Sequence, residues 1–272
     1  RQMCIRDSMN IFPTQYSVLK ADAVGGYIAQ EYNFAVTACR LLIHNVSDTY
    51  IVETEQDNYI FKIYRSNHRS ETEIRGESEL LGLLNENGAS VSYVLPNTDG
   101  DMLTAFNAAE GLRFGMLFTW AEGAPVYDLN YAQLKLLGRE MATLHTISEK
   151  ITLKNPRKEY NTNTTLSGPL KVIEPAFKNL PDEYAYLVET TSVIIEKMEQ
   201  LPLQDFSVGY CQYDFLPKNF HYLGDDKLTF FDFDFAGKGY LINDITTFYI
   251  HYFFDVTFGK RSREEADRCF TI

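Results

Sequence analysis

Two segments near the C-terminal end combine residue types suited to phosphate and metal chemistry. Asp214 and Asn219 stand five positions apart, and Asp232 follows inside the aromatic run 230–235. Carboxylates and amides among apolar strand residues cost free energy unless something pairs with them. A magnesium ion carrying nucleotide phosphates is the simplest partner, because Mg²⁺ takes oxygen ligands, few protein carboxylates and substrate phosphates. The pattern therefore predicts phosphoryl transfer.

A short hairpin is predicted to bring these residues together. Residues 219–222 and 228–231 are strand-like and are joined by a turn-rich connector. A hairpin of this size returns the chain to Asp232 beside Asn219, so the two can share one metal site. Asp214 lies in the preceding loop, where it can face an incoming hydroxyl. In kinases a catalytic-loop Asp accepts or orients the proton of the nucleophile, while an Asn and a second Asp hold the metals.

The full pattern resembles a known family signature. It reads D-x-x-x-x-N, then F-D-F-D-x-A-G-x-G, then Asn243-Asp244-Ile245, and it is similar to that of the aminoglycoside phosphotransferase and choline kinase superfamily, small-molecule kinases with a protein-kinase-like fold. The resemblance implies that Asp214 is the catalytic base or positioner, that Asn219 and Asp232 bind Mg²⁺, and that Asp244 is structural. We expect Asp234 to act as a further acid behind the metal site or as a paired structural residue.

The chain departs from the family pattern just before the catalytic Asp. The family usually has His-Gly there, whereas this chain has Gln212-Tyr213. We expect Gln212 to hydrogen-bond the loop backbone in place of His. The bulk of Tyr213 could alter the approach of a substrate.

Upstream residues fit the nucleotide half of such a site. Residues 49–54 and 59–64 flank a polar turn and predict an antiparallel hairpin, with Lys62 in mid-strand. Lys62 is either an edge-strand lysine that reaches to water or the lysine that holds ATP phosphates. Residues 70–86 predict a helix in which Glu77 lies beside the apolar stripe. The family has a Lys–Glu pair, which implies that Glu77 holds Lys62; Glu73 is the alternative in a shifted register.

The phosphate loop and the adenine site are less distinctive. Residues 42–48 contain no glycine, and the chain has neither G-x-x-x-x-G-K-[ST] nor G-x-G-x-x-G, which argues against P-loop and Rossmann proteins. The resembling family often has a polar loop here, which implies phosphate contacts from Ser47 and nearby backbone amides. The apolar strand 112–120 leads to a segment where the resemblance implies a hinge that receives adenine, comprising Thr119, Trp120, Ala121 and Glu122. A helix is predicted over residues 130–150, with a structural His145 near its end.

Composition excludes several other classes. The chain has 272 residues, is 45% hydrophobic and carries a net charge of −12, which permits a sizeable core and disfavours a general nucleic-acid binder. Four scattered cysteines predict a reduced, cytoplasmic protein. No apolar run is long enough to span a membrane. The polar residues 155–169 predict a long loop.

Together these features predict an α+β, two-lobed kinase-like fold. Residues 9–119 would form a sheet-rich N-lobe and 120–272 a mainly helical C-lobe, and residues 1–8 look like a non-native leader. Whether the chain is a fragment with a truncated C-lobe stays open. The predicted reaction transfers the γ-phosphate of ATP, with Mg²⁺, to a hydroxyl of a small molecule. A serine/threonine protein kinase and a nucleotide-binding pseudokinase are the alternatives, the latter because of Gln212-Tyr213. The identity of the acceptor and the oligomeric state stay open.

Overall fold

The computed structural model describes residues 14–271, so the predicted leader 1–8 lies outside the described residues. The chain divides into two compact units. Within the described residues, the first contains 14–71 and 94–120, and the second contains 72–93 and 121–271. The predicted boundary at 119–120 stays a prediction. The helix predicted over residues 70–86, which we expected in the N-lobe, belongs almost entirely to the second unit.

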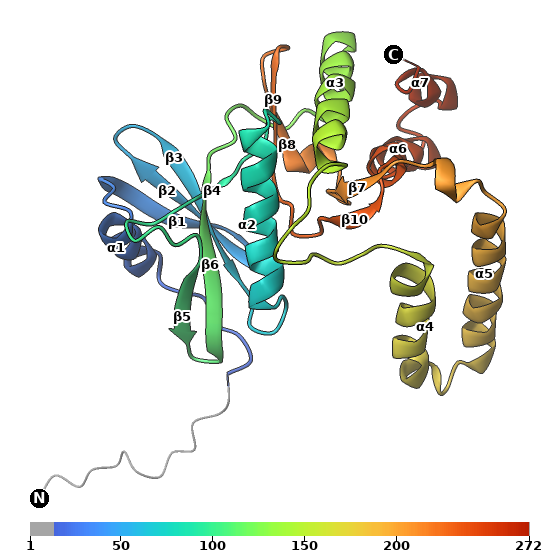
Figure 1. The fold of residues 1–272 in the computed structure, drawn as a ribbon, viewed down its shortest axis with the longest axis horizontal. Coiled ribbons are helices and arrows are strands. Elements are labelled where there is room, and N and C mark those ends of the chain that lie inside the picture. Colours follow the sequence, from blue (N-terminus) through green and yellow to red (C-terminus); the bar gives the residue numbers. More distant parts are fainter. Residues whose placement is uncertain (1–13, 272) are drawn as a thin grey trace, which may run out of the picture. The chain divides into compact units, whose positions relative to one another are not determined.

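The first unit is built on one antiparallel sheet in the order β1-β2-β3-β6-β4, with β5 also paired to β6 (Figure 1). Long runs of β-branched and aromatic residues form its central strands, as expected for a sheet with a buried face. Its elements are α1 (Ala21–Glu31), β1 (Val36–His44), β2 (Ser47–Thr54), β3 (Asn58–Tyr64), β4 (Val94–Leu95), β5 (Thr104–Ala108) and β6 (Gly111–Thr119).

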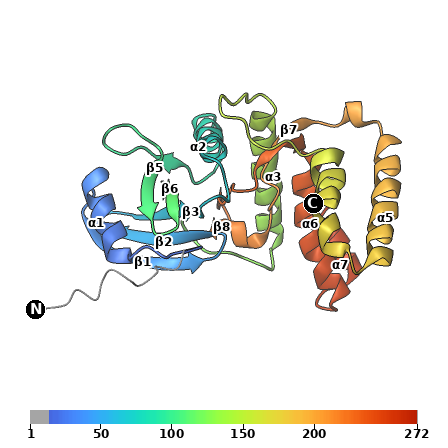
Figure 2. The same ribbon diagram turned by 90° about the horizontal axis from the view of Figure 1, so that it is seen from below.

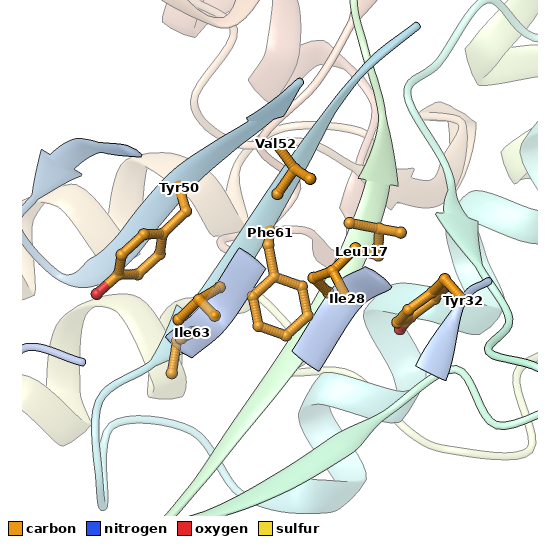
Figure 3. Close-up of a cluster of buried hydrophobic side chains, with 8 residues drawn as sticks. Ile28, Tyr32, Tyr50, Val52, Phe61, Ile63 and Leu117 are labelled. Carbon is orange, nitrogen blue, oxygen red and sulfur yellow. The ribbon is translucent and has the colours of Figure 1, made fainter. Parts of the chain in front are cut away.

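Helix α1 covers one face of this sheet and closes the core of the unit (Figure 3). Ile28 on α1 packs with Phe61 on β3 and Leu117 on β6, and all three side chains are fully buried. Burying side chains of this size stabilises a fold by roughly 1.5–3 kcal/mol each. The sheet is thereby held as a firm platform for the polar residues on β2 and β3.

The second unit is mainly helical and carries two small two-stranded sheets, β7–β10 and β8–β9. Helices α4 and α5 run alongside one another, and the Tyr184 hydroxyl donates to the Leu170 carbonyl (Figures 1 and 2). The elements are α2 (Glu71–Glu86), α3 (Tyr131–Ser148), α4 (Gly168–Ile173), α5 (Pro181–Glu199), β7 (Val208–Cys211), β8 (Phe220–Leu223), β9 (Lys227–Phe230), β10 (Gly237–Tyr240), α6 (Ile242–Thr257) and α7 (Arg263–Arg268).

Most predicted elements are confirmed within one or two residues. The two hairpins correspond to β2–β3 and β8–β9, and the helices predicted over 70–86 and 130–150 are α2 and α3. The loop predicted over 155–169 is wrong in its second half, because residues 163–167 form a π-helical turn that leads into α4. Pro169 misled the prediction, since proline is well accepted in the first turn of a helix. None of the helices between residues 14 and 271 combines the length and apolar character needed to cross a bilayer.

Candidate active site

The loop between β7 and β8 fixes Asp214 and Asn219 against each other. Asn219 ends a 3-10 turn that begins at Pro217, and its Nδ2 donates to both the Asp214 carbonyl (2.8 Å) and Asp214 Oδ2 (2.7 Å). A carbonyl and a carboxylate only accept, so the amide nitrogen of Asn219 must face them. The Asn219 amide oxygen is therefore turned away from Asp214 and available to a cation.

Asp214 also has a cationic neighbour. The Lys218 Nζ lies 2.9 Å from the same Oδ2 that accepts from Asn219. The Lys218 side chain is 55% exposed and the Asp214 side chain 19% exposed, so solvent screens this ion pair and its contribution to stability is small. Both contacts are made to the same carboxylate oxygen, Oδ2. They therefore fix the orientation of the Asp214 carboxylate.

The β8–β9 hairpin carries Asp232 to the same loop. Phe220 pairs with Phe230 in register, and the backbone N–H of Phe231 donates to the Asn219 carbonyl at 3.0 Å. Asp232 follows directly, with an exposed side chain and a left-handed backbone (φ 58°). The structure thus brings the segments of Asp214, Asn219 and Asp232 together, as the hairpin predicted.

The metal-binding roles of these residues are not tested by a bound ion. Between residues 14 and 271, no cluster of three or more His, Cys, Asp and Glu side chains could hold a metal by itself. A set of one amide oxygen and one carboxylate instead suits Mg²⁺ that is bound mostly by phosphates and water.

Asp244, at the start of α6, ties the loop between β7 and β8 to the helices. Its carboxylate is fully buried and accepts from the backbone N–H groups of Gln212 (3.1 Å) and Tyr213 (2.8 Å). His145 on α3 donates to it from Nε2 at 3.0 Å. The structural roles expected for Asp244 and His145 are confirmed.

Gln212 provides the contact expected of it. Its Nε2 donates to the Phe231 carbonyl at 2.6 Å. The backbone of Phe231 is therefore anchored on one side by Asn219 and on the other by Gln212, immediately before Asp232.

Tyr213 adopts a backbone conformation that favours glycine. Its φ is 64°, which costs an ordinary residue about 1–2 kcal/mol. Its ring stacks on Tyr160 with centroids 3.7 Å apart, and its hydroxyl accepts from Asn243 Nδ2 at 3.0 Å. The Tyr213 hydroxyl fits here only because residue 239 is glycine, since a Cβ at that position would lie 1.9 Å from the hydroxyl. Packing thus offsets the backbone strain, and burial raises the pKa of the phenol.

Arg157 is a buried residue that the sequence did not reveal. Its guanidinium donates to the carbonyls of Phe233 (3.0 Å), Asp234 (2.6 Å) and Ala236 (2.8 Å), and to that of Glu73 on α2 (2.7 Å). It holds the backbone that follows Asp232 against α2. An arginine in a polar loop, whose partners are main-chain carbonyls, leaves no signal in residue spacing.

Lys62 lies in the middle of the sheet of the first unit. β3 is flanked by β2 and β6, and Lys62 pairs with Thr49 on one side and Met116 on the other. The alternative of an edge-strand lysine is therefore wrong. Only 8% of the residue is exposed, and its Nζ lies 5.1 Å from the centre of the Tyr64 ring. A lysine buried this deeply in a central strand favours a bound partner.

Ser47 and Thr119 occupy the ends of strands in the same unit. Ser47 begins β2, is half-buried, and accepts from the Asn45 N–H through its carbonyl at 3.1 Å. Thr119 ends β6 opposite Tyr59, and Trp120 follows it. Their proposed nucleotide contacts stay predictions.

The other predicted nucleotide residues belong to the second unit. Glu77 is fully buried on α2, 3.9 Å from Arg157. The Ala121 carbonyl accepts from His221 Nδ1 at 2.8 Å, and Glu122 forms an exposed ion pair with Lys227. Lys62 and Glu77 lie in different units, so their pairing stays a prediction.

The comparisons with known proteins agree with this geometry. Residues 39–268 match the phosphotransferase enzyme family, a span that includes every candidate site residue. The chain belongs to this family. It is 31% identical over 239 residues to an uncharacterised protein of Synechocystis sp., which covers 87% of this chain and 66% of that protein. The chain thus spans about two thirds of the length of this family member.

Two further similar proteins have names that state an activity. The chain is 26% identical over 249 residues to the amicoumacin kinase of Bacillus subtilis, covering 89% of this chain and 69% of that enzyme. It is also similar to the structure of the amicoumacin kinase hAmiN in complex with AMP-PNP, Ca²⁺ and Ami. The TM-score is 0.69 at 22% identity, with 87% of this chain and 70% of that chain covered. This likeness shows that the phosphotransferase has the predicted α+β kinase-like fold.

Proposed function

We propose that the protein is a small-molecule kinase that transfers the γ-phosphate of ATP to a hydroxyl group. The observation that carries the proposal is the loop pair formed by residues 212–219 and 231–236, which hydrogen bonds join. The Asn219 side chain donates to Asp214, and the Asn219 carbonyl accepts from the N–H of Phe231. A catalytic carboxylate and two candidate metal ligands are thereby gathered on backbone that is fixed on both sides. Membership of the phosphotransferase family supports the same reaction.

Asp214 is the group that we assign to the acceptor hydroxyl. Its Oδ2 already accepts from Asn219 and Lys218, so Oδ1 is the oxygen assigned to the hydroxyl proton. A carboxylate held in this way orients the nucleophile for in-line attack and can accept its proton as the phosphoryl group transfers.

Asn219 and Asp232 are the residues that would hold Mg²⁺. They fit because the Asn219 amide oxygen is directed away from Asp214 and the Asp232 carboxylate is exposed. Bound with the nucleotide, the ion would neutralise the negative charge of the phosphates. The Ca²⁺ and AMP-PNP in the hAmiN structure support nucleotide and divalent-cation use in a relative.

The nucleotide itself is assigned to the residues predicted for it from the sequence. Lys62 would hold the phosphates with Glu77 as its carboxylate partner, and Ser47 would contact phosphate from the β1–β2 turn. The backbone of Thr119, Trp120, Ala121 and Glu122 would receive adenine. The buried position of Lys62 in a central strand supports its assignment.

The reaction is tested by Mg²⁺-dependent ATP turnover against a panel of acceptors. The panel contains aminoglycosides, choline, ethanolamine, homoserine, sugars and a generic protein. We expect phosphate transfer to one class of small hydroxyl compound, loss of transfer in Asp214→Ala, and wild-type activity in Asp226→Ala. Asp226 is a matched control because it is an exposed acid in the turn of the β8–β9 hairpin, which follows the loop of Asp214.

Other outcomes would favour the alternatives. Transfer to the protein alone would indicate a protein kinase. Nucleotide binding without transfer to any acceptor would contradict the proposed kinase activity and favour a pseudokinase. A pseudokinase is the second candidate because Tyr213 stands, with a positive φ, where the resembling family usually has glycine.

A further inference from the structure

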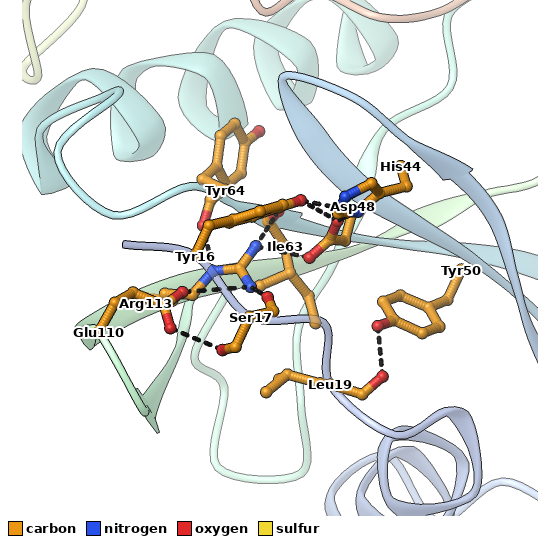
Figure 4. Close-up of polar contacts among 10 residues, drawn as sticks. All are labelled: Tyr16, Ser17, Leu19, His44, Asp48, Tyr50, Ile63, Tyr64, Glu110 and Arg113. Carbon is orange, nitrogen blue, oxygen red and sulfur yellow. Dashed lines mark hydrogen bonds and ion pairs between the residues drawn. The ribbon is translucent and has the colours of Figure 1, made fainter. Parts of the chain in front are cut away.

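A buried ion pair stands at the start of β2, one residue beyond Ser47. Arg113 on β6 donates from Nη2 to Asp48 Oδ2 at 2.8 Å, and both side chains are fully shielded from solvent (Figure 4). Removing two charges from water costs several kcal/mol per ion, and good geometry with further hydrogen bonds is needed to offset it. Such a pair is weak evidence for a role in stability alone, and its neighbours indicate a further role.

The second carboxylate oxygen of Asp48 gathers two more side chains. Asp48 Oδ1 accepts from the Tyr16 hydroxyl at 2.5 Å and from His44 Nδ1 at 2.8 Å. The Tyr16 ring also stacks on the His44 imidazole, with centroids 4.7 Å apart. Figure 4 shows these side chains converging on Asp48 from the N-terminal segment, the end of β1 and β6.

Arg113 extends the network to the backbone. Its Nε donates to the Tyr64 carbonyl at 2.9 Å and its Nη1 to the Ser17 carbonyl at 2.8 Å. Ser17 in turn donates from its hydroxyl to Glu110 at 2.6 Å. The position of Asp48 is thus fixed by the end of β3 and by the segment that precedes α1.

The Asp48 network holds the turn between β1 and β2. His44 and Asp48 are paired in register as the last pair of the hairpin, and their side chains bond across it. The intervening residues 45–47 contain no glycine, and their turn closes with the Asn45 N–H on the Ser47 carbonyl at 3.1 Å. Both ends of the turn are therefore held by one buried carboxylate.

We propose that Asp48 is a positioning residue for phosphate binding: with Arg113, Tyr16 and His44 it holds the turn 45–47 in the conformation that contacts nucleotide phosphates. This inference rests on the nucleotide site assigned under the proposed function. A turn that is ordered before binding loses less conformational freedom when the ligand arrives, which strengthens binding. Loosening the network weakens the binding of phosphates and leaves the contacts with the nucleoside intact.

The test compares the binding of Mg²⁺-AMP-PNP and of adenosine by titration calorimetry. Tyr16→Phe removes one hydrogen bond to Asp48, and Asp48→Asn removes its charge. Tyr27→Phe is the matched control. In the described chain the Tyr27 hydroxyl forms a hydrogen bond with Thr104 in the same unit and none with a residue of the Asp48 network. We expect Tyr16→Phe to weaken AMP-PNP binding roughly two- to tenfold and Asp48→Asn to weaken it further, with adenosine affinity and the control unchanged.

Each result decides the matter. Equal AMP-PNP affinity in the wild type and Tyr16→Phe, or an equal loss for adenosine, would overturn the positioning role and leave the proposed function standing. A wild type that binds no AMP-PNP would overturn the proposed function and this inference with it. Should Asp48→Asn fail to fold, as judged by circular dichroism, the pair Tyr16→Phe and Tyr27→Phe still carries the test.

Discussion

Replacing Asp244 by Asn should loosen the loop between β7 and β8 without changing the size of the side chain. The buried carboxylate accepts from the Gln212 and Tyr213 N–H groups and from His145. An Asn has one oxygen in place of two, so one of the two backbone donors loses its acceptor. The new amide group would also point a donor at that N–H.

The magnitude follows from these contacts. A hydrogen bond to a charged group contributes about 1.5–3 kcal/mol, and a buried donor left without an acceptor costs about 1–3 kcal/mol. Because one oxygen survives and the site can relax, we expect the free energy of unfolding to fall by about 2–4 kcal/mol. Urea denaturation measures this loss, and hydrogen exchange locates it.

Hydrogen exchange should accelerate in the peptide that contains Gln212 and Tyr213, since their N–H groups lose part of their protection. Thr247→Ala is the control, because Thr247 lies on the same helix and its hydroxyl donates to the Asn243 carbonyl one turn earlier. A loss below about 0.5 kcal/mol with unchanged exchange in this peptide would refute the bracing role of Asp244.

Three further predictions address other parts of the molecule. Arg157→Lys should lower the free energy of unfolding by about 2–4 kcal/mol in urea denaturation, because an ammonium cannot reach the four carbonyls that the guanidinium fork binds; an unchanged transition would contradict this. Burial raises the pKa of the Cys211 thiol, so mass spectrometry should find it unmodified by Ellman's reagent at pH 8 in the native protein and modified in urea. Burial also raises the pKa of Tyr32 from 10.0 to about 12. The folded state therefore holds the phenolic proton more tightly, and the stability that this contributes is complete below pH 10 and lost as the pH rises toward about 12; urea denaturation of the wild type and Tyr32→Phe across this range isolates this contribution, and an equal decline in both would contradict it.

The elements that carry the site were predictable because their signals are local. Alternating apolar residues and polar turns identify β2–β3 and β8–β9, and the helical spacing of leucines identifies α2 and α3. The hairpin alone indicated that Asp232 lies near Asn219. The first strand begins after Asn219, and the antiparallel second strand ends beside that starting point, just before Asp232. The confirmed bond between Phe231 and Asn219 follows from that reasoning.

The supporting contacts were not predictable, because their partners are distant or carry no side-chain signal. Arg157 binds main-chain carbonyls more than seventy positions away, and every residue has a carbonyl. Asp48 and Arg113 are 65 positions apart, and only the order of the strands brings them together. The edge-strand alternative for Lys62 could not be excluded from the sequence for the same reason, since strand order is a tertiary property.

The most direct test of the central claim is the binding of AMP-PNP with and without Mg²⁺, measured by calorimetry on the wild type and Asp232→Asn. It requires no knowledge of the acceptor. We predict that the wild type binds AMP-PNP tightly only when Mg²⁺ is present, and that Asp232→Asn loses about tenfold or more of this Mg²⁺-dependent affinity. Binding that is equally tight without Mg²⁺, or unchanged in Asp232→Asn, would contradict the assignment of this loop pair as a metal–nucleotide site.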